Sequence, residues 1–157
     1  MKNITLLCGK SGSGKDYISQ ALDLKLICTH TTRPKRSYEI NGFHKWFHMI
    51  DEIPHFTAWN IVAHTKRGKY YYWTWLEDLK SGDVYIIDIP GIKAILNHEY
   101  ASYHFKFKVV YLDCPLHKRI INMLKRGEKV IDIINRLYIE YKDFKPIKNI
   151  KHTRIKL

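Results

Sequence analysis

The sequence lacks the long apolar runs and paired cysteines that are typical of membrane and secreted proteins. No apolar run approaches the ~18 residues that a membrane span needs. The 3 cysteines are odd in number and widely spaced, and no Cys-x-x-Cys pair is available for a thiolate zinc site. Met1-Lys2-Asn3 leads directly into a predicted strand, so we expect no signal peptide. These absences predict a reduced, cytoplasmic protein without a membrane partner.

Acidic residues are scarce relative to basic ones, and no repeat, low-complexity tract or Pro/Gly-rich linker divides the chain. The 157 residues, of which 45% are hydrophobic, fit one globular domain with its own core. The net charge of +12 predicts anionic partners such as nucleotides, phosphates or nucleic acid. Because this charge is spread along the chain, with only some enrichment near the C-terminus, we do not expect nucleic acid to be the main partner.

Eight residues near the N-terminus have the pattern of a phosphate-binding loop. An apolar run at residues 4–8 leads into Gly9-Lys10-Ser11-Gly12-Ser13-Gly14-Lys15-Asp16, which has the Gly-x4-Gly-Lys spacing of a Walker A loop. Glycines let successive N–H groups point inward as an anion nest, and the following helix adds its positive end. Lys15 can then reach the β- and γ-phosphates of ATP. The alternative, a simple Gly/Ser turn, is disfavoured by the strand–loop–helix context.

Asp16 stands where this loop usually carries Ser or Thr, whose hydroxyl ligates Mg²⁺. A carboxylate is also a hard oxygen ligand and can hold Mg²⁺ directly or through water. The alternative is an acid in the first helical turn that complements the helix dipole. Both interpretations stay open.

The order of the predicted elements indicates an α/β core with a parallel sheet. Apolar strands are predicted at residues 4–8, 24–28, 84–89 and 108–113, with a last strand at 150–155. Helical patterns lie between them at residues 17–22, 91–97, 116–125 and 130–141. Residues 29–81 break this alternation with β-rich sequence, including a hairpin at 61–74 and a short helix at 75–80. We expect an inserted subdomain that covers the site.

Two arginines three residues apart, Arg33 and Arg36, lie in the basic, turn-rich segment after the predicted strand at residues 24–28. Two neighbouring guanidinium forks can hold a phosphate dianion in a fixed orientation. A nucleophilic phosphate needs such a clamp, because phosphoryl transfer depends on positioning and charge stabilisation. The alternative is a solvated basic turn, which the phosphate loop in the same chain disfavours.

An ordered set of motifs resembles the guanylate kinase family over nearly the whole chain. Its Thr-Thr-Arg signature is matched by Thr31-Thr32-Arg33, with Arg36 and Glu39-Ile40-Asn41-Gly42 following at the family spacing. Its hairpin is similar to Gly68-Lys69-Tyr70-Tyr71, and its strand ending in Asp is similar to Ile86-Ile87-Asp88. Its mobile lid is similar to Arg126-Gly127 together with the later Arg136-Leu137. A single motif of this kind is weak support for the resemblance, whereas the whole set in the family's order is strong support.

The resemblance implies a P-loop nucleoside monophosphate kinase, which transfers the γ-phosphoryl group of ATP with Mg²⁺. It implies a P-loop NTPase three-layer fold with a core at residues 1–28 and 82–157, an NMP-binding insertion at about 29–81 and a short lid at about 125–136. A monomer or homodimer is expected.

By position, the resemblance also implies roles for individual residues. ATP would be bound by the loop from Gly9 to Asp16, and the metal by Asp16 and Asp88. The acceptor would be bound by Thr29, Arg33, Arg36, Lys45, Tyr71, Trp73 and Thr74. Catalytic roles would fall to Lys15, Arg33, Arg36, Asp88, Arg126 and Arg136.

The sequence departs from the family where guanine is read. Trp73 stands at the position of a base-contacting Ser or Thr, and Pro90 at that of a second Asp. No acid occurs between Glu52 and Glu77, where the family has a guanine-binding Glu; the aligned position is near Val62. Because hydrogen-bonding groups supply most base discrimination, guanine specificity does not follow. GMP or dGMP is the first expectation, and a different or modified-base dNMP is the alternative, with Trp46 or Trp73 stacking on the base.

Two interpretations of other kinds stay open. The acceptor could be a sugar phosphate or a nucleic-acid 5′ end, for which the +12 charge is the support. A non-catalytic guanylate-kinase-like binding module is disfavoured by the intact Gly9, Gly14 and Lys15. The Lys- and Ile-rich, Ala-poor composition favours an AT-rich genome, and the compact length fits a bacteriophage member, which would act in the host cytoplasm.

Overall fold

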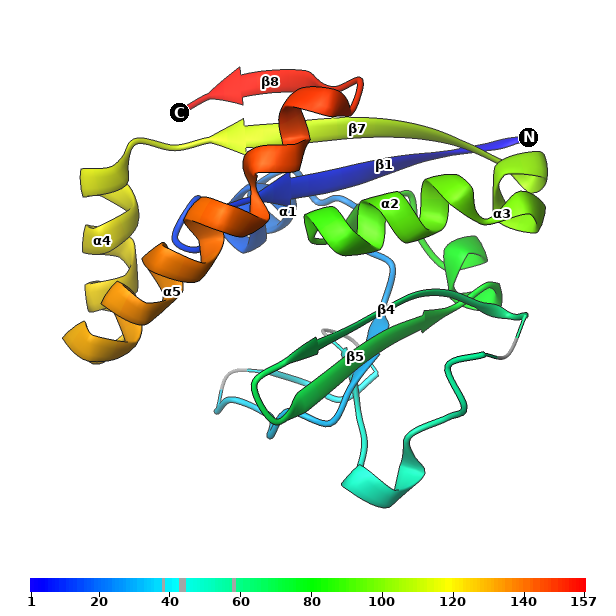
Figure 1. Ribbon diagram of the computed structural model, residues 1–157, viewed down its shortest axis with the longest axis horizontal. Coiled ribbons are helices and arrows are strands. Elements are labelled where there is room, and N and C mark those ends of the chain that lie inside the picture. The colour runs from blue at the N-terminus through cyan, green and yellow to red at the C-terminus, as the bar shows by residue number, and fades with distance from the viewer. Residues whose placement is uncertain (38, 43–44, 58) are drawn as a thin grey trace.

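Two four-stranded sheets organise the protein in a computed structural model that describes residues 1–37, 39–42, 45–57 and 59–157. The core sheet has the strand order β6 (Val84–Ile86), β1 (Lys2–Gly9), β7 (Phe105–Asp113) and β8 (Thr153–Lys156). All neighbours in it are parallel. Figure 1 shows this sheet above a second, smaller sheet.

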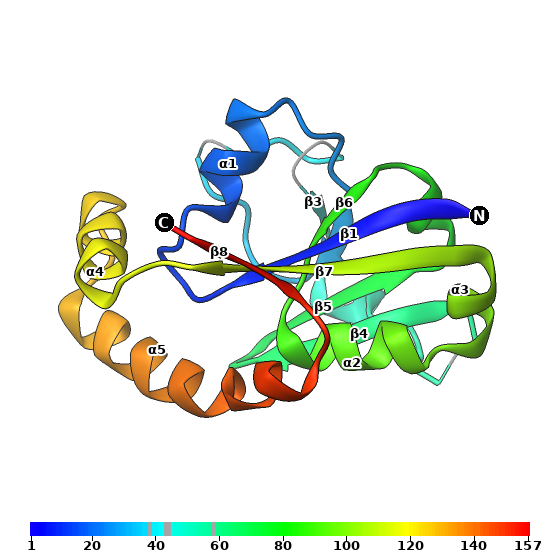
Figure 2. The same ribbon diagram turned by 90° about the horizontal axis from the view of Figure 1, so that it is seen from above.

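The central strand β1 is apolar because helices cover both faces of the core sheet. Its residues Ile4, Leu6 and Cys8 pack in one cluster with Ile92 of α2 (Ile89–Asn97). Leu7 points the other way, into a cluster that Ile18 of α1 (Lys15–Ala21) joins. Strands buried on both faces are typical of parallel sheets. Figure 2 shows α1 on one side of the sheet and α2 with α5 on the other, which gives the expected three layers.

Two helices follow β7 and extend beyond one edge of the core (Figure 1). They are α4 (Leu116–Lys125) and α5 (Val130–Asp143), and between them Gly127 has a φ of 76°. The sequence pattern predicted α4 with the same bounds and α5 two residues short of its end. The predicted lid at 125–136 corresponds to this connection and the first half of α5. The chain then passes through the 3₁₀ segment η3 (Lys145–Asn149) into β8.

The inserted segment forms the second sheet, in the order β3 (Lys45–Phe47), β2 (Thr29–Thr31), β5 (Tyr70–Trp75) and β4 (Ile61–Arg67). The β4–β5 hairpin confirms the predicted one, and its turn uses Gly68 with a φ of 59°. Short 3₁₀ segments lie at η1 (Ile50–Glu52) and η2 (Glu77–Lys80). Val62 and Leu79 join the main core cluster, so the insertion packs firmly against the core.

The prediction of a strand at residues 24–28 is wrong. Within this range only Leu26 makes a bridge, to Val84 at the edge of the core sheet. The apolar pattern of residues 24–28 arises because Leu24 and Leu26 pack against the cluster that contains Leu7. The chain then continues into β2 of the inserted sheet. The short helix α3 (Glu99–His104) was not predicted. Among the described residues, no helix has the length and apolar character needed to cross a membrane.

Candidate functional site

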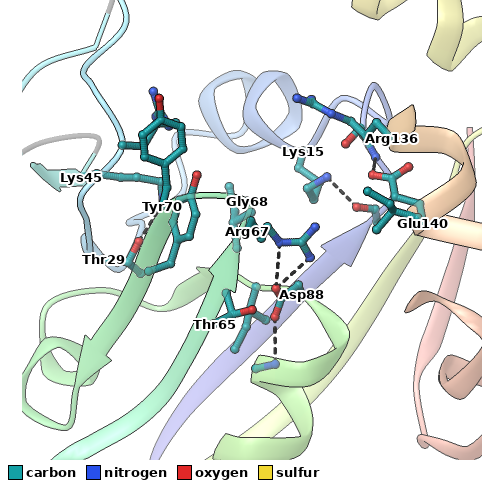
Figure 3. A pocket seen from close by; sticks show the side chains of 18 of the residues that line it. Lys15, Thr29, Lys45, Thr65, Arg67, Gly68, Tyr70, Asp88, Arg136 and Glu140 are labelled. Atoms are coloured by element: carbon teal, nitrogen blue, oxygen red, sulfur yellow. Dashed lines mark hydrogen bonds and ion pairs between the residues drawn. The ribbon is translucent and has the colours of Figure 1, made fainter. Parts of the chain in front are cut away.

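A cavity of about 930 Å³ lies at the carboxyl ends of β1 and β6, where the core meets the inserted sheet (Figure 3). Parallel α/β sheets place their ligands at this edge. Many of the site residues predicted from the sequence line it, namely Gly9, Ser11, Lys15, Thr29, Arg33, Arg36, Lys45, Trp73, Thr74, Asp88 and Arg136. Others are not among its lining residues, namely Lys10, Gly12, Ser13, Gly14, Asp16, Tyr71 and Arg126.

The phosphate loop has the backbone conformation that its glycines predict. Gly12 and Gly14 have φ values of 75° and 81°, in the left-handed region that favours glycine. A Cβ on Gly12 would also lie 2.4 Å from the Arg119 carbonyl oxygen. The Lys15 Nζ donates to the carbonyl oxygens of Gly9 at 2.7 Å and Lys10 at 3.2 Å, and burial lowers the pKa of this ammonium. Lys15 is therefore held against the loop at the floor of the cavity.

Side chains of α4 and α5 hold this loop from outside. Arg119 donates from Nε to the Ser11 carbonyl at 2.9 Å, and Asn122 donates to the Gly12 carbonyl at 2.8 Å. Glu140 accepts from the Ser11 amide at 2.7 Å and from Arg119 at 2.5 Å. Arg119, Asn122 and Glu140 were not predicted, since each looks in the sequence like an ordinary charged or polar position on a helix.

The two clamp arginines depend on Glu39, which is 7% exposed. Its carboxylate accepts from the Arg33 guanidinium at 2.6 Å and from the Arg36 backbone N–H at 2.7 Å. Burial alone would raise the pKa of Glu39, but these hydrogen bonds and charges hold it below its usual value. Glu39 thus fixes the turn that presents Arg33 and Arg36 to the cavity, a role that its place in the sequence motif did not reveal.

Lys45 and Thr29 lie on neighbouring strands at the same cavity wall. The Lys45 Nζ donates to Thr29 Oγ1 at 2.7 Å, as β2 and β3 pair in parallel. Burial lowers the pKa of Lys45, and the carboxylate of Asp16 raises it in part. Both residues line the same cavity as Arg33 and Arg36.

The hairpin places two other tyrosines in the cavity in place of Tyr71. Side chains alternate along a strand, and Tyr70 and Tyr72 face the cavity. Tyr71 faces the opposite side, where its ring lies 5.9 Å from Phe56 and 5.0 Å from the Lys66 ammonium. Tyr71, the predicted acceptor ligand, therefore does not line the cavity, whereas its neighbours Tyr70 and Tyr72 do.

Trp73 and Thr74 both border the cavity but differ from their predicted roles. Trp73 is 2% exposed, and its ring packs against those of His30 and His48 at 5.5 Å and 5.0 Å. It belongs to the core of the inserted sheet and presents no open face for a base to stack on. Thr74 is fully buried and shares a short hydrogen bond of 2.5 Å with the Tyr85 hydroxyl. Trp46 is 42% exposed.

Asp88 lies in the cavity wall two residues after β6, and both of its carboxylate oxygens accept hydrogen bonds. Oδ1 accepts from the Gly91 backbone N–H at 2.8 Å, which caps the N-terminus of α2. Oδ2 accepts from Arg67 Nη2 at 2.8 Å and Nε at 3.2 Å, and Figure 3 shows this pair inside the cavity. Arg67 carried no motif signal and was not predicted.

The two predicted lid arginines occupy different positions. Arg136 lines the cavity and pairs with Glu128 at 3.1 Å. Arg126 forms a long ion pair with Asp16 beside the phosphate loop, with 3.9 Å between its Nη2 and the Asp16 Oδ2. The part of the chain that the structure describes contains no cluster of three or more His, Cys, Asp or Glu side chains that could hold a metal.

Known proteins with similar sequences are guanylate kinases. The chain is 31% identical over 145 residues to the guanylate kinase of Mycoplasmopsis pulmonis, covering 80% of this chain and 71% of that protein. It is 28% identical over 146 residues to the guanylate kinase of Paraburkholderia xenovorans, covering 85% of this chain and 63% of that protein. No protein-family model matches the chain.

The fold agrees with these relatives. The crystal structure of guanylate kinase from Anaplasma phagocytophilum superposes with a TM-score of 0.61 at 18% identity, covering 99% of this chain and 76% of that chain. This likeness confirms the predicted P-loop α/β fold. With the sequence relatives and the phosphate loop, it shows that the chain belongs to the guanylate kinase family.

Proposed function

We propose that the protein is an ATP-dependent nucleoside monophosphate kinase with GMP or dGMP as its first acceptor. One observation carries this proposal. The phosphate loop with Lys15 and the guanidinium clamp of Arg33 and Arg36 line the same cavity, so one phosphate chain and one acceptor phosphate can meet there. The guanylate kinase relatives support this assignment of donor and acceptor.

The residues supply positioning and charge for an in-line transfer. An oxygen of the acceptor phosphate attacks the γ-phosphorus of ATP, and the bond from this phosphorus to the β–γ bridging oxygen breaks. The electron pair of that bond leaves with ADP. The acceptor oxygen is already anionic, so no strong general base is needed. Lys15 and the loop amides hold the donor, Arg33, Arg36 and Lys45 hold the acceptor, and Arg126 and Arg136 close over the transferring group.

We propose that Mg²⁺ accompanies ATP at Asp16. This carboxylate follows Lys15 in the first turn of α1, and its side chain is 58% exposed, so a hard oxygen ligand is accessible beside the phosphate loop. Asp88 is the other candidate, but its two oxygens already accept hydrogen bonds from Arg67 and Gly91. When bound, Mg²⁺ neutralises charge on the β- and γ-phosphates. A cytoplasmic location and a monomeric or homodimeric state stay predictions.

A monophosphate with a different or modified base is the second candidate. Two of the aligned positions for reading guanine, Val62 and Trp73, are each 2% exposed and offer no carboxylate. Groups that do line the cavity near the hairpin are Thr65, Tyr70 and Tyr72. A site with neutral donors and acceptors discriminates bases less strongly than one with carboxylates on the guanine N–H groups.

An ATP-coupled assay of GMP, dGMP, AMP, CMP, UMP, dTMP and base-modified monophosphates tests the proposal. We expect turnover with at least one of them and the highest kcat/KM with GMP or dGMP. Absence of turnover with every monophosphate would contradict the function, and a different preferred base would select the second candidate.

Calorimetry separates the kinase from a non-catalytic binding module. We expect Mg·ATP to bind the wild-type protein and to lose most of its affinity in Lys15→Ala, because the ammonium neutralises the phosphates. Lys25→Ala removes an exposed lysine outside the cavity and serves as the control. Equal ATP affinity in all three proteins would exclude the proposed donor site.

A further inference from the structure

Arg67 reaches from the inserted sheet to the phosphate-loop side of the cavity. It is the last residue of β4, pairs with Tyr70 across the hairpin, and precedes the turn at Gly68. Its side chain lines the cavity and is 39% exposed. In Figure 3, Arg67 and Asp88 lie between Lys15 on one side and Tyr70 with Thr29 on the other. The guanidinium therefore lies between the donor and acceptor parts of the site.

The core sheet places the partner of Arg67 beside the donor loop. Leu7 of β1 is in register with Ile86 of β6, and the Ile87 N–H donates to the Leu7 carbonyl at 3.1 Å. Two residues beyond this pair, β1 ends at Gly9, where the phosphate loop begins, and the chain that follows β6 reaches Asp88. The Arg67–Asp88 ion pair is thus level with the first residue of the phosphate loop.

The geometry of the ion pair leaves part of the guanidinium for a ligand. Nε and Nη2 of Arg67 both donate to the same oxygen, Asp88 Oδ2. A guanidinium has five N–H donors in a planar fork, and among the described residues Nη1 makes no hydrogen bond. Burial lowers the pKa of Arg67, but the carboxylates of Asp88, Asp143 and Glu140 more than offset this, and the net shift is upward. The group stays cationic.

We propose that Arg67 is a catalytic arginine that contacts the transferring phosphoryl group, and that Asp88 is the positioning residue that holds it there. This inference rests on the proposed kinase function and deepens it. As the acceptor oxygen bonds to the γ-phosphorus and the bond to the β–γ bridging oxygen breaks, negative charge is spread over the equatorial oxygens. N–H groups already aimed at that position stabilise this charge without rearrangement.

The alternative role for this ion pair is to join the hairpin to the core. Partly exposed ion pairs contribute little to stability, typically about 0–1 kcal/mol. A joining role would therefore change unfolding slightly and leave the rate of the chemical step unchanged. The kcat of an Arg67 variant therefore distinguishes the two roles, because only the catalytic role predicts a fall in kcat.

The test measures steady-state kinetics with the acceptor that gives the highest turnover. For Arg67→Ala we expect kcat to fall by about 10³–10⁵-fold, in the range of other arginines that act on phosphoryl transfer, with both KM values within about 3-fold. Arg67→Lys keeps the charge but loses the fork, so its kcat should lie between those of Arg67→Ala and the wild-type protein. Lys66→Ala is the matched control, because the neighbouring Lys66 side chain lies over Tyr71 on the other face of the hairpin. Its kcat should equal that of the wild-type protein.

A second measurement distinguishes contact with the reacting group from a change in folding. ADP, the acceptor and aluminium fluoride together mimic the transferring phosphoryl group. We expect Arg67→Ala to lose at least about 10-fold in affinity for this mixture and to bind ADP alone as the wild-type protein does. Asp88→Asn should lower kcat by about 10-fold, and the double variant should fall no further than Arg67→Ala, because both act through one contact.

The outcomes separate this inference from the proposed function. A wild-type protein that turns over no monophosphate overturns both. An active wild-type protein with unchanged kcat in Arg67→Ala overturns the role of Arg67 alone. Unchanged kcat with a raised acceptor KM in Arg67→Ala also overturns it, because Arg67 would then bind the ground state of the acceptor only.

Discussion

The Glu140 carboxylate on α5 accepts a hydrogen bond from the Ser11 backbone N–H of the phosphate loop at 2.7 Å. The same carboxylate pairs with Arg119 of α4, which in turn donates to the Ser11 carbonyl. Arg119 is 5% exposed and Glu140 4% exposed, so this ion pair is buried. The loop that grips phosphate is thereby held in shape by two helices more than 100 residues further along the chain.

Removing this carboxylate should destabilise the protein and loosen the loop. Glu140→Ala would leave Arg119 buried without its charge partner, which costs about 3–5 kcal/mol in the free energy of unfolding. Urea unfolding measures this loss, and calorimetry should show weaker ATP binding. The double variant Arg119→Met with Glu140→Leu should recover much of the stability, because a well-packed apolar pair can replace a buried ion pair. Wild-type stability in Glu140→Ala would contradict the structural role.

Asp16 should be replaceable by the hydroxyl that the loop usually carries. Asp16→Ser supplies a Mg²⁺ ligand and loses an exposed contact to Arg126 at 3.9 Å. We expect Mg²⁺-dependent turnover that is retained or increased, measured as kcat over a Mg²⁺ titration. Asp51→Ser changes an exposed acid in η1 and serves as the control. Loss of turnover with intact ATP binding would instead make the Asp16 carboxylate a required metal ligand.

Neutralising Glu39 should weaken the acceptor clamp. In Glu39→Gln the side chain keeps its shape but loses the charge that holds Arg33 and the Arg36 backbone. We expect the acceptor KM to rise by about 10- to 100-fold, since a hydrogen bond to a charged group contributes about 1.5–3 kcal/mol. Steady-state kinetics measures this change, and an unchanged KM would show that Arg33 needs no such support.

The same carboxylate should make stability depend on pH in the acid range. The folded pKa of Glu39 is lowered relative to an unfolded value of about 4.3, so the folded state binds fewer protons there. Its contribution is complete above about pH 4.3 and is lost as the pH falls toward the folded pKa. Unfolding of the wild-type protein and Glu39→Gln at pH 7 and pH 3.5 should therefore show a difference in stability that shrinks at the lower pH. A constant difference would contradict the shift.

Local patterns were enough to predict the phosphate loop, the β4–β5 hairpin and α4. The glycine spacing at Gly9–Gly14, the turn at Gly68 and the helical period of residues 116–125 each depend on neighbours a few positions away. Which side chains of a strand point to which face of the sheet is harder to predict, because a shift of one residue moves every side chain to the opposite face. The resemblance of residues 68–71 to the family hairpin implied Tyr71, and three consecutive tyrosines offer no alternation that would show from the sequence that Tyr70 and Tyr72 line the cavity instead.

Long-range charge pairs left no signal in the sequence. Arg67 precedes a hairpin turn and Glu140 lies in a helix rich in charged residues, so either looked like a solvated side chain. The register of β1 with β6 brings Asp88, the partner of Arg67, to the level of the phosphate loop, and the return of α5 brings Glu140 to Ser11. A strand was wrongly predicted at residues 24–28 for a related reason. Their apolar pattern reflects packing at the edge of the core, where only an isolated bridge forms.

A pair of histidines packs behind the guanidinium clamp in the inserted sheet. His30 Nδ1 and His48 Nε2 lie 2.8 Å apart and form a hydrogen bond, in which one ring nitrogen donates and the other accepts. His48 also approaches Glu52 at 3.5 Å and packs against Trp73. Burial lowers the pKa of His48, the neighbouring His30 lowers it further, and Glu52 raises it in part. The net shift is downward, so the folded protein favours the neutral ring.

The stability of the protein should therefore fall as the pH drops below about 6.5, the unfolded pKa of histidine. Between this value and the lower folded pKa of His48 the unfolded chain binds more protons, so the free energy of unfolding rises with pH. Urea unfolding at pH 7.5 and 5.0 measures the loss. His48→Asn should lose less stability over this interval than the wild-type protein, while His55→Asn, which changes an exposed histidine, should match it. Equal losses in the wild-type protein and His48→Asn would show that another group controls the acid sensitivity.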